Sequence, residues 1–215
     1  MSLPNRPRTM ILARLLAAAA AAWWLIGSAA AQAPIPGYPD NWDAFDAREV
    51  ALLPSYCKHT QVFRERVPGD ADERERWIAY FGPGYLHLHH YCWGLMKTNR
   101  GALLARSRES RVFYLSDAIG EYDYVIRRVP PDFVLLPEIL TRKADNLILL
   151  GRGPQGVAEL MRAIDTKADY WPAYGKLADY YKDTGEVAKA RDALKQGLAA
   201  APDAVALQRR LETLK

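Results

Sequence analysis

The sequence lacks the short motifs that mark the common catalytic sites. It has no G-x-S-x-G turn, no phosphate-binding loop, no dinucleotide fingerprint and no H-E-x-x-H zinc motif. It also has no C-x-x-C-H haem motif. Gly151-Arg152-Gly153 falls in a predicted turn between helices and not after a strand, so it does not qualify as a dinucleotide loop. We therefore expect neither an enzyme nor a cofactor.

Acidic residues are missing from the first thirty positions, where an apolar run extends from Leu15 to Ile26 and small residues follow to Ala31. Three arginines stand before or at the start of this run: Arg6, Arg8 and Arg14. This layout is typical of a secretory signal peptide. We expect residues 1–31 to be removed by cleavage after Ala31. The alternative is an uncleaved inner-membrane anchor, because the stretch from Leu15 to Ala31 just reaches the lower limit of length for a membrane span.

A strong excess of charge is also missing once this segment is set aside. The whole chain carries a formal net charge of +4. Cleavage removes three arginines and no acid, which leaves the mature chain at +1. Overall charge therefore predicts no nucleic-acid binding, and it predicts a membrane contact only through the N-terminal segment if that segment is retained.

Cysteine is scarce, with Cys57 and Cys92 the only two. An even pair in an exported protein predicts a disulfide bond. Two buried free thiols are the alternative.

Four histidines are present, and three of them crowd the segment from Tyr85 to Trp93. On a helix, His87 and His90 share one face, and His89 and Cys92 share another. Each face offers two ligands, whereas zinc needs three or four. His59 or Cys57 could supply a third. We expect packed helix residues and no metal; the alternative is a metal- or thiol-handling protein using this cluster, with His87 and His90 as ligands.

A repeated pattern dominates the C-terminal part of the chain. The last copy consists of an aromatic residue, a small residue and large apolar residues on one helix, a glycine turn, and a small and a large residue on the next helix: Tyr174, Leu177, Ala178, Tyr181, Gly185, Ala190, Leu194 and Pro202. Much of this pattern is also present at a constant shift earlier in the chain: Leu140, Ala144, Leu147, Gly151, Gly156 and Leu160. Lys143 and Ala168 depart from it.

This pattern resembles the tetratricopeptide (TPR) repeat, whose copies are about 34 residues long. The resemblance implies two repeats at 137–204, and a divergent third at 87–134 that uses Trp93-Gly94, Ala118, Tyr122 and Pro130. The third copy needs a longer helix pair or an inserted loop around Leu104 to Ser110. We expect an all-α fold, with antiparallel helix pairs stacked as a short TPR-like solenoid.

The remaining boundaries follow from composition. Residues 32–41 are rich in proline and glycine and are expected to be flexible, and residues 42–136 form a helical N-terminal region with the divergent repeat. Residues 205–215 form a capping helix whose apolar stripe is Leu207, Leu211 and Leu214.

By resemblance, the first helix of each repeat lines a concave face that binds a partner. The residues expected on it are Thr141, Asp145, Ile148, Gly175, Asp179 and Lys182. Because Asp145 and Asp179 are acidic, a partner's C-terminal carboxylate would be repelled, and basic, amphipathic or internal segments are favoured. We expect a periplasmic adaptor or scaffold for a protein or peptide partner in envelope assembly, secretion or polysaccharide export.

Overall fold

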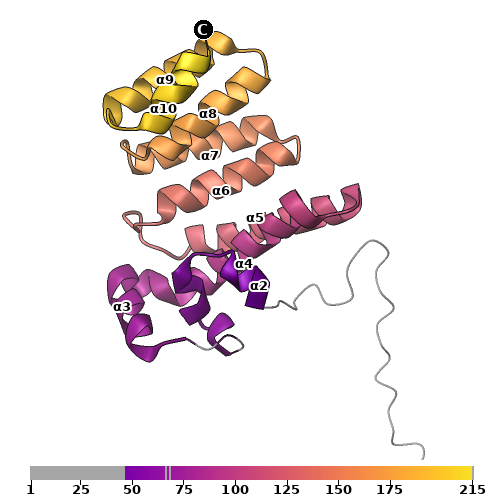
Figure 1. The fold of residues 1–215 in the computed structure, drawn as a ribbon, viewed down its shortest axis with the longest axis vertical. Coiled ribbons are helices and arrows are strands. Elements are labelled where there is room, and N and C mark those ends of the chain that lie inside the picture. The colour runs from indigo at the N-terminus through magenta and orange to yellow at the C-terminus, as the bar shows by residue number, and fades with distance from the viewer. Residues whose placement is uncertain (1–46, 66, 68, 215) are drawn as a thin grey trace, which may run out of the picture. The chain divides into compact units, whose positions relative to one another are not determined.

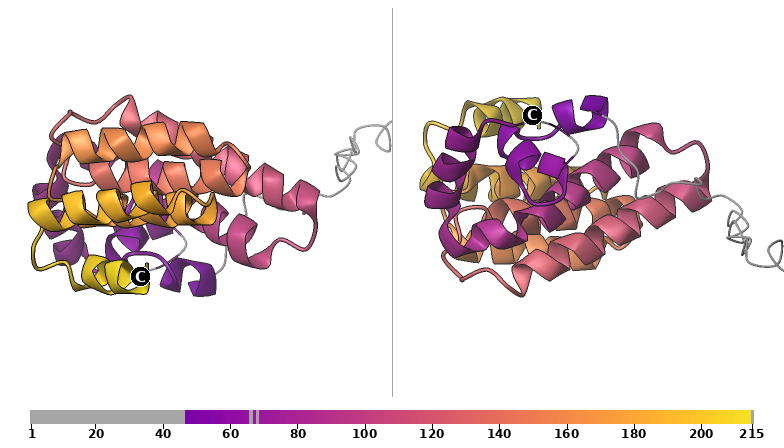
Figure 2. Two further views of the ribbon diagram at one scale, coloured as in Figure 1. Left: turned by 90° about the horizontal axis from the view of Figure 1, so that it is seen from above. Right: turned by 90° about the horizontal axis from the view of Figure 1, so that it is seen from below.

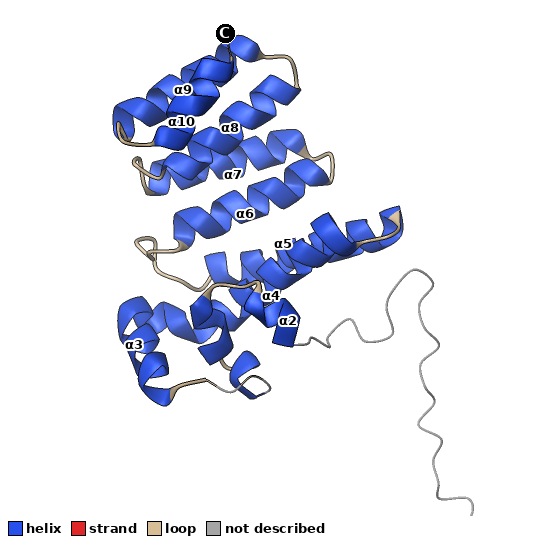
Figure 3. Ribbon diagram, viewed as in Figure 1, coloured by secondary structure: helices blue, strands red, loops and turns tan. Residues whose placement is uncertain are grey.

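The computed structural model describes residues 47–65, 67 and 69–214, and within them every regular element is a helix (Figure 3). The predicted signal peptide with its cleavage at Ala31 and the predicted flexible start at 32–41 lie outside these residues. No helix in the described part of the chain is long and apolar enough to span a bilayer.

Three antiparallel helix pairs and a final helix form a stack, as Figure 1 shows. The pairs are α4 (Leu88–Asn99) with α5 (Arg108–Ile126), α6 (Leu136–Leu149) with α7 (Gly153–Thr166), and α8 (Trp171–Asp183) with α9 (Val187–Ala200). Helix α4 continues as the π-helical segment η5 (Arg100–Leu104), and α10 (Val205–Thr213) ends the stack. The expected all-α, solenoid-like fold is confirmed.

The segment before the first pair is irregular. It contains α2 (Ala47–Ala51), the 3-10 segments η2 (Ser55–His59), η3 (Phe63–Glu65) and η4 (Gly82–His87), and α3 (Ala71–Phe81). Asp70 caps α3 by accepting hydrogen bonds from the backbone N–H groups of Asp72 and Glu73. Tyr56 packs edge-on against both Trp77 and Phe81, so aromatic contacts hold η2 against α3.

The two later pairs share the same turn. Gly151 and Gly185 follow α6 and α8, have φ angles of 76° and 80°, and occupy the same position in the two repeats. After each glycine, a backbone N–H bonds back to the helix: Arg152 to Leu147 at 2.8 Å and Glu186 to Tyr181 at 2.7 Å. A left-handed glycine with this back-bonded N–H ends both helices in the same way.

Small residues lie where the helices of a pair touch. Ala144, Ala178 and Ala190 are almost completely buried. A Cβ atom on Gly156 would be only 2.6 Å from Ile148 Cγ1, which shows how closely α7 approaches α6. In the first pair, a Cβ on Gly94 would be 2.3 Å from the ring of Tyr122. The extra residues of that pair lengthen its helices through η5 and α5.

Candidate functional site

The first helices of successive pairs lie against one another. Direct contacts join α4 to α6, α6 to α8, and α8 to α10, but no comparable contact joins α7 to α9 among the described helices. A helical stack whose first helices touch while its second helices are spread apart is curved, with the first helices on the inner side. The concave face is therefore formed by α4, α6, α8 and α10.

Two ion pairs bridge neighbouring helices on this face. Lys176 Nζ on α8 lies 2.9 Å from Asp145 Oδ2 on α6. Arg210 on α10 binds Asp179 on α8 through Nε at 3.2 Å from Oδ1 and through Nη2 at 3.2 Å from Oδ2. The two acids are one repeat length apart in the sequence, and so are the two cations. We call each such pair a rung; the same rung occurs twice, displaced by one repeat.

Arg142 occupies the cation position of the preceding rung, one repeat length before Lys176. Within the described residues its ion pair is with Glu138 of its own helix, at 3.5 Å, and its side chain is 48% exposed. Burial opposes the charged form of Arg142, but Tyr91 of α4 and Glu138 act the other way and raise its pKa. The guanidinium therefore faces a tyrosine of α4 where the later rungs have an aspartate.

Buried tyrosine hydroxyls lie close to Arg142. The hydroxyl oxygens of Tyr56 and Tyr91 are buried and have no hydrogen-bond partner of normal geometry in the described structure. Burial raises the pKa of both phenols, and the nearby charge of Glu138 raises it further. Burial and Glu138 also raise the pKa of Tyr170, to about 12. The shifts keep these phenols protonated at neutral pH, so they add no negative charge beside Arg142.

The acids of the face are not free. Burial raises the pKa of Asp145 even though Lys176 lies beside it, and the charge of Asp179 adds to this rise. Lys176 on α8 neutralises Asp145 on α6, and Arg210 on α10 neutralises Asp179 on α8. The two rungs therefore carry no net charge. The sequence predicts an acidic groove from Asp145 and Asp179 alone, and the structure corrects this prediction. The cations that pair with these aspartates come from α8 and α10, and a comparison of positions within one repeat overlooks them.

The other residues expected on this face have different surroundings. Thr141 is buried and donates its hydroxyl hydrogen to the Pro137 carbonyl at 2.8 Å. Gly175 is buried beneath α10, where an added Cβ would meet Leu207 at 3.4 Å. Ile148 packs toward Gly156 of α7, and Lys182 is exposed. Lys182 is thus exposed, Asp145 and Asp179 are partly exposed within their rungs, and contacts within the protein occupy the other three.

The predicted disulfide is confirmed. Cys57 of η2 and Cys92 of α4 are bonded, and both are completely buried. The alternative of two free thiols is wrong. Because Cys92 is oxidised, it offers no thiolate to a metal or to a redox partner.

The histidine segment is tied into an ionic cluster between α4 and α5. His90 Nδ1 lies 2.5 Å from Glu121 Oε2, and the buried ammonium of Lys97 lies 2.6 Å from Glu121 and 2.7 Å from Asp117. Burial lowers the pKa of both His87 and His89. Among the described residues, no three side chains of the types His, Cys, Asp and Glu are placed to hold a metal ion.

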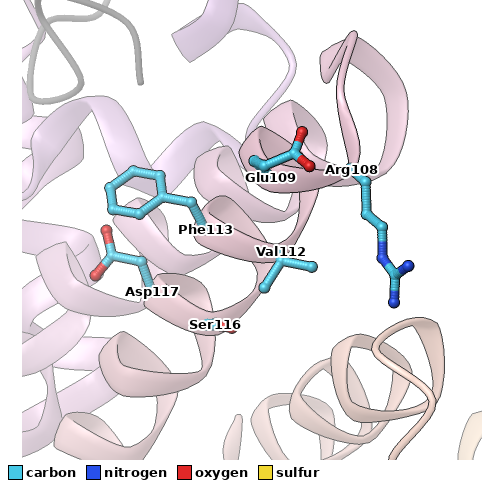
Figure 4. A pocket seen from close by; sticks show the side chains of 6 residues that line it. All are labelled: Arg108, Glu109, Val112, Phe113, Ser116 and Asp117. Carbon is cyan, nitrogen blue, oxygen red and sulfur yellow. The ribbon is translucent and has the colours of Figure 1, made fainter. Parts of the chain in front are cut away.

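A hollow on α5 is a second surface feature (Figure 4). Its described lining residues all come from two to three turns of this one helix: Arg108, Glu109, Val112, Phe113, Ser116 and Asp117. One helix supplies one wall, which does not define a ligand's position. The concave face, with its repeated rungs and the exposed Arg142, is the better candidate site.

No protein-family model matches the chain, and no curated protein matches it at a significant level.

Proposed function

We propose that this protein is an exported adaptor or scaffold of the tetratricopeptide type, which binds a segment of a partner protein along the concave face of α6, α8 and α10. Three features recur with the period that this kind of repeat has, about 34 residues. They are the glycine turns at Gly151 and Gly185, the buried small residues of each pair, and the rungs.

The contact of the first helices with one another carries this proposal. It leaves a continuous inner face, and on the α6, α8 and α10 part of this face charged side chains stay partly exposed. Elsewhere the same helices bury alanine, glycine and leucine against their neighbours. A partly solvated, concave and polar face suits reversible binding of a peptide segment better than permanent packing.

Arg142 indicates the chemistry of the partner. The later rungs pair each cation with an aspartate, whereas Arg142, in the matching position, faces Tyr91 of α4 and has, among the described residues, its ion pair with Glu138 of its own helix at 3.5 Å. A partner carboxylate, from an aspartate or glutamate side chain, would complete the rung and accept two hydrogen bonds from the guanidinium. We therefore propose that the bound segment carries an acidic residue where it passes over α6.

The proposed compartment is the periplasm, with the inner-membrane anchor as the alternative. The buried disulfide supports an oxidising compartment, because disulfides rarely persist in the reducing cytosol. Envelope assembly, secretion and polysaccharide export are the processes in which such an adaptor would act.

Selection of short peptides from a displayed random library tests the proposal. We expect the peptides that bind the protein to be enriched in aspartate or glutamate. We expect Arg142→Gln to weaken their binding at least tenfold, which is about 1.4 kcal/mol.

Lys195→Gln provides the matched control, since Lys195 is an exposed cation on the second helix α9. It should leave peptide binding unchanged. The proposal fails if selected peptides bind Arg142→Gln as well as the unmodified protein, or if Lys195→Gln is the variant that loses them.

A further inference from the structure

The far end of the α4–α5 hairpin projects from the stack. In the views from above and below, η5 and the start of α5 extend beyond the other helix pairs (Figure 2). We call residues 103–112, which include the end of η5 and the first turn of α5, the hairpin tip. The proposed partner-binding face lies on other helices, so the hairpin tip is a separate surface.

The hairpin tip exposes large apolar side chains. Leu103, Leu104 and Val112 are 75%, 60% and 45% exposed. The wide turn of η5, closed by a 2.8 Å hydrogen bond from the Ala105 N–H to the Arg100 carbonyl, buries Gly101 against Leu115. With its base fixed in this way, the hairpin directs two adjacent leucines into solvent, which packing within the chain does not require.

Cationic side chains follow these leucines closely in the sequence. Arg106, Arg108 and Arg111 lie at the surface, and none of them forms an ion pair within the part of the chain that the structure describes. Glu109 is the one acid among them. Figure 4 shows Arg108 and Val112 extending from adjacent turns of α5 toward the same side. The hairpin tip therefore combines exposed apolar side chains with three exposed guanidinium groups within ten residues.

We propose that the hairpin tip binds the surface of an anionic lipid bilayer. Leu103 and Leu104 would enter the boundary between headgroups and acyl chains, while the arginines bind lipid phosphates. The leucines stand at a narrow end rather than on a broad face, and this shape fits insertion into lipid better than docking against a folded protein. The near-neutral mature chain does not weaken the proposal, since the attraction acts within a Debye length of the local charges.

Co-sedimentation with vesicles tests this proposal on the full chain as it is isolated. The two probes are vesicles of phosphatidylcholine alone and vesicles of phosphatidylcholine mixed with phosphatidylglycerol. We expect at least tenfold tighter binding to the anionic vesicles. Each Arg→Gln change at Arg106, Arg108 or Arg111 should weaken this binding roughly fivefold, and high salt should abolish their contribution.

The decisive comparison is between two double variants. Leu103→Glu with Leu104→Glu should lose at least tenfold in binding to anionic vesicles. Leu52→Glu with Leu86→Glu is the matched control, because these leucines are 69% and 70% exposed on other elements. It adds the same charge, and any binding through the N-terminal segment affects both variants equally. Melting curves should be alike, since all four positions are exposed.

Three outcomes would overturn the proposal. One is equal vesicle binding by the two double variants, and another is equal binding of the unmodified protein to neutral and anionic vesicles. The third is concentration-dependent self-association that Leu103→Glu with Leu104→Glu abolishes, without any vesicle binding. This last result would assign the hairpin tip to an interface between copies of the chain.

Discussion

Gly94 offers a sharp test of the packing between α4 and α5. A Cβ atom at this position would lie 2.3 Å from Cε1 and 2.7 Å from Cδ1 of Tyr122. The Tyr122 ring is completely buried, and its hydroxyl shares a 2.8 Å hydrogen bond with Thr98, which also accepts one from Asn146. The ring is therefore held at its hydroxyl end and cannot move aside without losing a contact.

The size of the effect of Gly94→Ala follows from three contributions. Alanine in a helix interior gains about 1 kcal/mol over glycine. Overpacking of a close contact costs about 1–3 kcal/mol, and a displaced Tyr122 hydrogen bond costs about 0.5–1.5 kcal/mol more. We expect a net loss of about 0.5–3.5 kcal/mol in the free energy of unfolding. For a domain of this size, each kcal/mol lowers the melting temperature by about 2–4 °C.

Gly120→Ala is the matched control for this prediction. Gly120 lies in α5, is exposed, and has no heavy atom within 4 Å of an added Cβ. It keeps the helix-propensity gain without the clash, so it should raise the free energy of unfolding by about 0.5–1 kcal/mol. Urea and thermal unfolding followed by circular dichroism, with the disulfide intact, measure both variants. If Gly94→Ala is as stable as the unmodified protein, the close approach of α4 and α5 is refuted.

Three further predictions concern the disulfide, acid stability and the last rung. Replacing Cys57 and Cys92 by alanine should lower the free energy of unfolding in urea by about 3–4 kcal/mol, because the bond closes a loop across a sequence separation of 35; a loss below about 1 kcal/mol would contradict this. Burial lowers the pKa of His87 and His89, so the native state binds fewer protons than the unfolded chain, and stability should fall as the pH drops below about 6.5. Asparagine at both positions should reduce this loss of stability, as measured by urea unfolding at successive pH values. If stability falls as steeply with pH in the double variant, the two histidines are not the cause. Asp179→Asn removes the ion pair with Arg210 between two half-exposed side chains, so it should change the free energy of unfolding by less than about 1 kcal/mol. Global unfolding of this variant would show instead that the rung holds α10 in place.

The sequence predicted the features that repeat along the chain. Small residues such as Ala178 and Ala190 mark helix contacts wherever the pattern recurs, and they are buried as expected. The disulfide was predictable because only two cysteines exist. Residues 47–87 repeat nothing, and their 3-10 segments depend on distant aromatic contacts such as Tyr56 with Phe81. A local pattern does not contain that information.

The surroundings of the concave-face residues were harder to predict. Gly175 is covered because α10 packs over it, and Thr141 turns back to its own helix, so each position depends on a neighbour or a rotamer. One periodic feature of the sequence does indicate the rungs. Arg142, Lys176 and Arg210 follow one another at intervals of one repeat length, and the period alone could have identified the cation side of the rungs.

Site-specific photo-crosslinking in intact cells tests the central claim most directly. A photoreactive amino acid would replace Lys182 on α8 or, as the matched position, Lys195 on α9; both lysines lie at the surface. If the concave face of the first helices binds the partner, position 182 forms a crosslink to another protein, Arg142→Gln abolishes it, and position 195 forms none. Crosslinks from position 195 with none from position 182 would contradict the account.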